Sequence, residues 1–114
     1  MRRQNVLFSV ALALIASSAS PSLASSTSPG RAENVTAVDT GFIYFLHDGT
    51  RTPPPACATD PRWILDPNSA GAKNMYEAIL YARKNGQRVI VQGTGTCNVS
   101  TTNELVAWVV IYDF

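Results

Sequence analysis

The sequence predicts a small, mainly β domain with one helix, stapled by one disulfide. Short apolar runs bounded by Gly, Pro, Asn and Asp indicate strands. One longer run carries apolar residues at spacings of three and four, which indicates an amphipathic helix. Only two cysteines, Cys57 and Cys97, occur in the 114 residues. Small exported domains commonly need a covalent link because their core is small, so we expect a structural Cys57–Cys97 disulfide.

The start of the chain has the pattern of an export signal. Arg2 and Arg3 precede an apolar run over 6–16, and small residues follow. The stretch Ser22-Leu23-Ala24 favours cleavage after Ala24, with Ala19 as a second position. The apolar run is too short to cross a bilayer, which needs about 20 residues. We therefore expect a signal peptide at 1–24 and a secreted or periplasmic protein without a membrane span after cleavage.

Composition divides the remainder into two parts. Residues 25–33 are polar and rich in turn formers, which predicts a flexible mature N-terminus followed by one folded domain at 34–114. Two of the nine Lys and Arg lie in the leader, so seven remain against eight Asp and Glu. Binding to nucleic acid or to anionic membranes requires clustered positive charge. We expect neither partner.

Three strands are expected before the helix. The first two, at 34–38 and 41–47, flank a turn, and the second is apolar on both faces, which indicates burial on both sides. The proline-rich stretch 48–55 favours an extended path. We interpret it as a rigid connector rather than as a ligand for a proline-binding domain. A short apolar strand at 63–65 ends at Asp66-Pro67, a cap and first-turn pair that predicts a helix start.

The helix and two further strands complete the domain. Gly86 and the basic residues before it are expected to end the helix, whose apolar stripe consists of Ala72, Met75, Ile79 and Ala82. Strands are expected at 88–92 and at 104–112, and the last of these is apolar on both faces.

This order of elements favours a particular architecture. Five strands with one helix between the third and fourth fit a small, closed or partly open barrel with the helix at one end. A ferredoxin-like sandwich would need a second helix between the first two strands. We therefore predict a mainly β, five-stranded barrel like the oligonucleotide/oligosaccharide-binding (OB) fold.

The residues give no catalytic or metal-binding set. His47 is the single histidine, and no second residue completes a nucleophile, base and orienter pattern. His47 could be a base or a pH sensor, but we interpret it as a solvated residue at a strand end. One histidine and two distant cysteines form no metal cluster, and Gly93-Thr94-Gly95 is only a fragment of a dinucleotide fingerprint. We expect no enzyme, no metal and no cofactor.

A polar loop before the last strand is the candidate ligand site. Its hydroxyl and amide groups suit hydrogen bonds to sugars, and in OB-like barrels this loop lies at a frequent ligand position. The alternative is a solvated loop held by the disulfide. The candidate residues are Thr94, Thr96, Asn98, Ser100, Thr101, Thr102 and Asn103.

The last strand carries the candidate oligomer face. A small barrel has one interior, so one face of this strand needs another cover: the helix, the loop at 48–62, or a second subunit. The residues on the candidate face are Val106, Trp108, Val110 and Tyr112.

The stretch at 75–91, MYEAILYARKNGQRVIV, resembles the helix and following strand of bacterial toxin B subunits of the subtilase-cytotoxin and pertussis-like branch. The shared features are Leu80-Tyr81 and Gly86-Gln87 before a Val-rich strand. The chain also resembles small exported proteobacterial proteins with Gly-x-Gly-x-Cys at this place, here Gly93 to Cys97.

The resemblance implies a function. Such B subunits form pentameric rings of barrel domains that bind cell-surface glycans and carry a catalytic A subunit. It therefore implies a secreted, non-catalytic glycan-binding module, a homopentamer, with a glycan and an A-type subunit as partners. No sugar-contacting residue of the family matches this sequence, so none is transferred. The alternative is a monomeric periplasmic structural or inhibitory protein without a sugar ligand.

Overall fold

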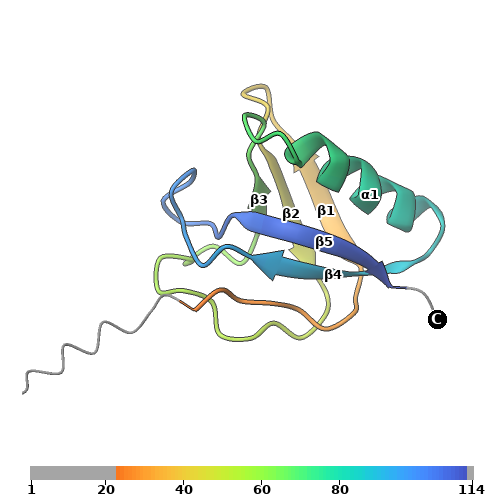
Figure 1. Cartoon of the computed structure of the whole chain (residues 1–114), viewed down its shortest axis with the longest axis horizontal. Helices are drawn as coiled ribbons and strands as arrows, with labels where there is room; N and C mark the ends of the chain where they lie inside the picture. The colour runs from red at the N-terminus through yellow and green to blue at the C-terminus, as the bar shows by residue number, and fades with distance from the viewer. Residues whose placement is uncertain (1–22, 113–114) are drawn as a thin grey trace, which may run out of the picture.

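The computed structural model describes residues 23–112. Their elements follow the predicted order of three strands, one helix and two strands. The strands form two antiparallel sheets, and the helix lies along one side of them (Figure 1). Most of the expected leader at 1–24 lies outside the described residues.

The first sheet contains β1 (Ala32–Ala37), β2 (Ile43–His47) and β3 (Trp63–Leu65) in that spatial order. The turn between β1 and β2 includes Gly41, whose φ of 90° is a left-handed conformation that favours glycine. Phe45 of β2 lies opposite Trp63 in the register, and both side chains are buried. The short strand β3 is buried throughout, so it forms the centre of the core.

The second sheet pairs β4 (Arg88–Gly93) with β5 (Val106–Tyr112). The helix α1 (Ala72–Lys84) contacts both strands of this sheet and β3 of the first. Ile79 and Ala82 of α1 are buried in the same core as Val89 and Val91 of β4. The helix therefore joins the two sheets, and it does so through the apolar stripe that the sequence predicted.

The start of α1 differs from the expectation. Asp66 and Pro67 do not begin the helix, which starts at Ala72 without a side-chain cap. The Asp66 carboxylate instead accepts the Asn68 N–H at 2.9 Å, and its carbonyl accepts the Ser69 N–H at 3.0 Å. Asp66 thus stabilises a separate turn. Aspartate side chains can hydrogen-bond nearby backbone N–H groups in a turn instead of capping a helix.

The end of α1 agrees with the expectation. Gly86 follows the helix with a φ of 66°. The Gln87 N–H donates to the Ala82 carbonyl at 2.8 Å, and the Gly86 N–H donates to the Arg83 carbonyl at 3.3 Å. These two bonds form a Schellman motif, which satisfies carbonyls left free at a helix end.

The stretch 25–33, expected to be flexible, is packed against β4. The Thr27 N–H donates to the Val91 carbonyl at 2.9 Å, and Gly30 and Val89 exchange two backbone bonds at 3.0 and 2.7 Å. Its small residues let the backbone approach closely: a Cβ on Gly30 would lie 2.6 Å from the Asp48 carboxylate. The expectation of flexibility was therefore wrong, and the packed chain begins near Ser25 rather than at residue 34.

The predicted disulfide is confirmed. Cys57 and Cys97 are bonded, with their Cα atoms 6.0 Å apart and a sequence separation of 40. The bond joins the connector before β3 to the loop after β4. Among residues 23–112, no helix has both the length and the apolar character needed to cross a membrane.

Removing the disulfide should destabilise the fold strongly. We expect the double variant Cys57→Ser/Cys97→Ser to lose about 3–4 kcal/mol of unfolding free energy, because the unfolded chain regains the entropy of a loop of about 40 residues. Urea unfolding of the oxidised protein and of the variant measures the difference. The reduced wild-type protein is the control and should match the variant. Equal midpoints for the oxidised protein and the variant would contradict the role given to the bond.

Candidate functional site

A buried carboxylate lies at the junction of the N-terminal segment, the connector and the polar loop. Glu104 is 0% exposed. Its Oε1 accepts Arg51 Nη2 at 2.8 Å and the Ser25 hydroxyl, and its Oε2 accepts the N–H groups of Ser25 at 3.1 Å and Gly95 at 3.0 Å. A buried carboxylate is tolerated only with such partners. We call these four residues the Glu104 network.

Arg51 is held from two sides. Its Nε donates to the Ser25 hydroxyl at 2.9 Å, and its guanidinium lies 3.9 Å from the centre of the Trp63 ring. The stacking places the cation over the negative face of the indole. Sequence reasoning missed this network. The available signal was a glutamate at the start of an otherwise apolar strand.

The Gly93-Thr94-Gly95 sequence has a structural role in this network. A Cβ on Gly93 would lie 1.8 Å from Glu104 Oε2 and 2.8 Å from the Trp63 ring, so only glycine leaves room for the carboxylate. Gly95 has a φ of 80° and aims its N–H at the same oxygen. The fragment of a dinucleotide fingerprint thus serves a carboxylate of the chain itself: Gly93 leaves room for it and Gly95 donates to it.

Asn103 holds the candidate ligand loop from inside. Its side chain is buried, and its Oδ1 accepts the hydroxyl groups of Ser100 at 2.8 Å and Thr102 at 2.9 Å. Its Nδ2 donates to the Arg62 carbonyl at 3.0 Å. Asn103 was predicted as a ligand residue, but its amide is committed within the fold, so it positions the loop.

The other candidate residues divide between internal bonds and the surface. The hydroxyl groups of Thr94 and Thr96 lie 2.8 Å apart, and Thr96 donates to Asn98 at 3.4 Å. Thr101 makes no side-chain hydrogen bond to the described part of the chain. Ser100 is half-buried, and the exposed members are Thr94, Thr96, Asn98, Thr101 and Thr102.

An ion pair and an aromatic ring lie beside this loop. The Asp60 N–H donates to the Thr102 carbonyl at 3.0 Å. Arg62 Nη2 lies 2.7 Å from Asp60 Oδ2, and its guanidinium lies 4.7 Å from the centre of the Tyr44 ring. Hydrogen bonds from Arg62 lower the pKa of the Asp60 carboxyl from 3.8 to about 2. The loop therefore adjoins a carboxylate that is ionised at neutral pH.

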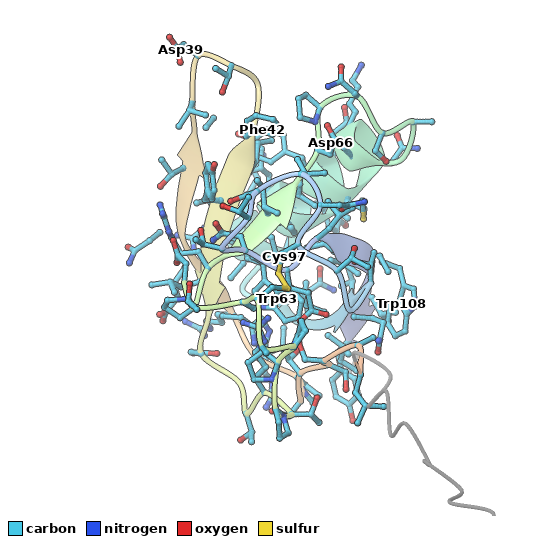
Figure 2. All side chains as sticks on the ribbon, turned by 90° about the vertical axis from the view of Figure 1, so that its left-hand side faces the viewer. Asp39, Phe42, Trp63, Asp66, Cys97 and Trp108 are labelled. Carbon is cyan, nitrogen blue, oxygen red and sulfur yellow. A yellow bond between two sulfur atoms is a disulfide. The ribbon has the colours of Figure 1, made fainter. Side chains whose placement is uncertain are left out.

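The candidate oligomer face is present in part. Trp108, Val110 and Tyr112 are 46%, 45% and 41% exposed, and Figure 2 shows Trp108 pointing away from the body of the molecule. Val106 was predicted on the same face but is buried in the core. The register shows why: Gln92 pairs with Trp108 but Gly93 pairs with Val106, so Ala107 is an extra residue.

His47 is bound within the fold rather than solvated. Its Nε2 lies 2.8 Å from the Val89 carbonyl, and its Nδ1 accepts the Gly49 N–H at 3.0 Å. In this pattern Nδ1 accepts a hydrogen bond and Nε2 donates one to the carbonyl. His47 therefore links β2 to β4. No group of three or more metal-ligating side chains occurs within residues 23–112.

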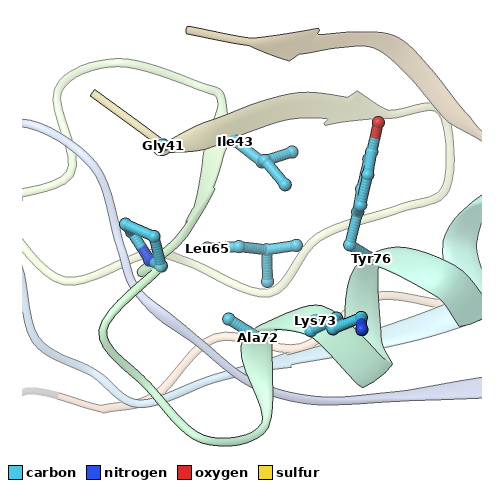
Figure 3. Close-up of a pocket in the computed structure, with 7 residues that line it drawn as sticks. Gly41, Ile43, Leu65, Ala72, Lys73 and Tyr76 are labelled. Carbon is cyan, nitrogen blue, oxygen red and sulfur yellow. The ribbon is translucent and has the colours of Figure 1, made fainter. Parts of the chain in front are cut away.

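A pocket that sequence reasoning did not predict lies between β2, β3 and α1. It encloses about 210 Å³, and Figure 3 shows Ile43 and Leu65 on one side with Tyr76 and Lys73 rising from the helix. The lining is mostly apolar, and its polar side-chain groups are the Tyr76 hydroxyl and the Lys73 amine. With so few converging polar groups, it offers less specificity than the loop at 94–103.

The Asp60–Arg62 pair gives a pH-dependent prediction. Because the folded pKa of Asp60 is below its unfolded value, the pair adds stability above about pH 4, and this is lost as the pH falls towards 2. Both side chains are partly exposed, 23% and 42%, so we expect about 1 kcal/mol.

Urea unfolding at pH 7 and pH 2 tests this. Asp60→Asn should be less stable than the wild type at pH 7, and most of this deficit should disappear by pH 2. Glu77→Gln, a change at an exposed position of α1, is the matched control and should show no such convergence. A deficit of Asp60→Asn that persists unchanged at pH 2 would show that the ion pair is not its cause.

Comparison of this chain with protein-family models, with curated proteins and with solved structures finds no match. The function is therefore inferred from two features of the structure: the exposed part of the loop and the apolar face of β5.

Proposed function

We propose that this protein is a secreted, non-catalytic binding module that assembles into a homo-oligomeric ring and binds glycans. The observation that carries the proposal is the outer face of β5, formed by Trp108, Val110 and Tyr112. All three side chains are more than 40% exposed. Large apolar side chains gathered on one strand face are typical of a surface that a protein partner covers.

A second copy of the chain is the cover that fits this face. The sequence left three alternatives, and neither the helix nor the loop at 48–62 buries these side chains in the structure. β4 and β5 form a two-stranded sheet. In the described part of the chain, the second edge of β5 therefore pairs with no other strand beyond the single bridge at Leu105. Such an edge offers backbone groups to a neighbouring chain.

The architecture proposed for each subunit is an OB-like barrel. Isolated bridges support it, because they connect the two sheets at both sides. Ile64 of β3 pairs in parallel with Leu105 just before β5, and Gly30 and Ser26 pair antiparallel with β4. The stretch from 26 to 37 thus contacts β4 with its first half and β2 with its second half. That double pairing is what closure of a small barrel requires.

The polar loop is the proposed glycan site. The disulfide at Cys97 and the buried Asn103 hold the loop, so its outward hydroxyl groups are ordered before a ligand arrives. Pre-ordering reduces the entropy lost on binding. The side chains of Asp60 and Arg62 lie beside it and add charged hydrogen-bonding groups. The proposed contacts are Asn98, Thr101 and Thr102.

The resemblance to toxin B subunits supports two further parts of the proposal: five copies per ring and a catalytic A-type subunit as partner. The disulfide is compatible with export, because it persists in oxidising compartments. The competing function is a monomeric periplasmic structural or inhibitory protein. Mass in solution separates the two.

Size-exclusion chromatography with light scattering should give the mass of five chains for the exported protein. Trp108→Glu should give single chains, because a charge cannot be buried at the centre of the interface. Tyr81→Glu is the matched control, since Tyr81 is 58% exposed on α1, and it should leave the ring intact. A wild-type protein with the mass of one chain would favour the competing function. An unchanged oligomeric mass for Trp108→Glu would show that this face is not the interface.

A glycan array tests the ligand. We expect the double variant Asn98→Ala/Thr101→Val to weaken binding to any glycan recognised by the wild type at least about tenfold, the effect of losing one to two hydrogen bonds. Thr40→Val, at the exposed turn before β2, is the matched control and should bind like the wild type. If the assembled ring binds no glycan on the array, glycan binding is ruled out and only the ring assembly of the proposal remains.

A further inference from the structure

Glu104 accepts a hydrogen bond from a backbone group at an unusual place in the chain. One of the two donors to its Oε2 is the Ser25 N–H, at 3.1 Å. Glu104 is fully buried, and Arg51 on Oε1 is its one cationic partner among the described residues. A neutral peptide N–H therefore lies beside Oε2, where a second cation would be attracted most strongly to the carboxylate.

Burial begins abruptly at this residue. Leu23 is 72% exposed and Ala24 is exposed, whereas Ser25 is 0% exposed. From Ser25 onward the backbone is bonded to the sheet, beginning with the Gly93 N–H that donates to the Ser25 carbonyl at 2.8 Å. The boundary between exposed and buried chain thus coincides with the peptide bond that the small-residue pattern marks for cleavage.

We propose that cleavage of the Ala24–Ser25 bond creates the second cation of this site, the α-ammonium of Ser25, which pairs with Glu104. A signal peptidase adds one water across the peptide bond. Ala24 leaves with the new carboxylate, and the Ser25 nitrogen becomes an amine. Its ordinary pKa is about 8, so it takes up a proton at neutral pH. A carboxylate beside it further favours the protonated form.

The geometry accommodates this charge. Each carboxylate oxygen then faces one cation: Arg51 at Oε1 and the ammonium at Oε2. The surplus positive charge falls on Arg51, whose side chain is 17% exposed and reaches solvent. One further N–H of the ammonium takes the direction of the broken bond to Ala24, a residue that is exposed. The bond to Oε2 then joins two opposite charges instead of a neutral N–H and a carboxylate, which strengthens it.

The pair has a consequence for the candidate ligand loop. Glu104 Oε2 also accepts the Gly95 N–H at 3.0 Å, and the next residue, Leu105, donates to the Thr96 carbonyl at 3.0 Å. Fixing the carboxylate therefore fixes the start of the loop. Because Ser25 is buried once this segment packs, we expect the Ala24–Ser25 bond to be cut before the segment packs. The start of the loop is therefore fixed only after the leader has been removed. This order of events does not depend on ring assembly.

The test compares two mature chains at one protein concentration, one with a free Ser25 amine and one with that amine acetylated. We expect the free amine to raise the Tm by about 4–8 °C, the shift that one stronger bond gives in a domain of this size. In the Glu104→Gln background the two chains should melt together. Equal Tm values in the wild type, or the same gap in Glu104→Gln, would overturn the proposal.

A labelling experiment avoids dependence on a variant that may not fold. In the native wild-type protein, the Ser25 amine should react with an amine-specific reagent at pH 7 at least tenfold more slowly than the amine of a control chain that begins at Ala24. Equal rates would overturn the pairing. Intact mass of the exported protein should place the N-terminus at Ser25, and a chain beginning at Ser20, after the alternative site Ala19, would contradict the proposal.

Discussion

The buried carboxylate of Glu104 is the constraint on which the rest of the structure depends. It lies between four segments that are distant in the sequence: the N-terminal stretch, the connector with Arg51, the β3 residue Trp63 and the Gly-rich turn after β4. Burying an ion without partners costs several kcal/mol. These segments can therefore pack only in an arrangement that brings their donors to the carboxylate, which couples the N-terminus to the loop.

Around this centre, two further links fix the candidate ligand loop. The Cys57–Cys97 bond ties it to the connector, and Asn103 ties it to the Arg62 carbonyl. These links order the polar surface of the loop. The outer face of β5, in contrast, is apolar. There the bulge at Ala107 turns Val106 inward and leaves Trp108, Val110 and Tyr112 outward. One domain thus has an ordered polar loop and an exposed apolar strand face, the two features on which the proposed function rests.

Sequence periodicity predicted the features that depend on local chemistry. The strand order, the stripe from Ala72 to Ala82, the left-handed Gly86 and the disulfide all follow from residue type and spacing. The errors arose where tertiary contacts decide. Asp66 capped a turn instead of the helix, a bulge changed the side of Val106, and a stretch with the composition of a flexible tail gained backbone partners on β4. The Glu104 network joins residues up to 79 positions apart, and no local pattern reports such contacts.

Native-state hydrogen exchange on Glu104→Gln tests the central constraint most directly. If the carboxylate couples the segments, the amides of Thr27, Gly30, Gly93 and Gly95 should lose protection together, while amides in the middle of α1 keep theirs relative to global unfolding. The substitution leaves Arg51 without its buried partner, and changes of this kind commonly cost about 3–5 kcal/mol. Unchanged protection at Gly95 and along 25–30, or a uniform loss across the domain, would contradict the account.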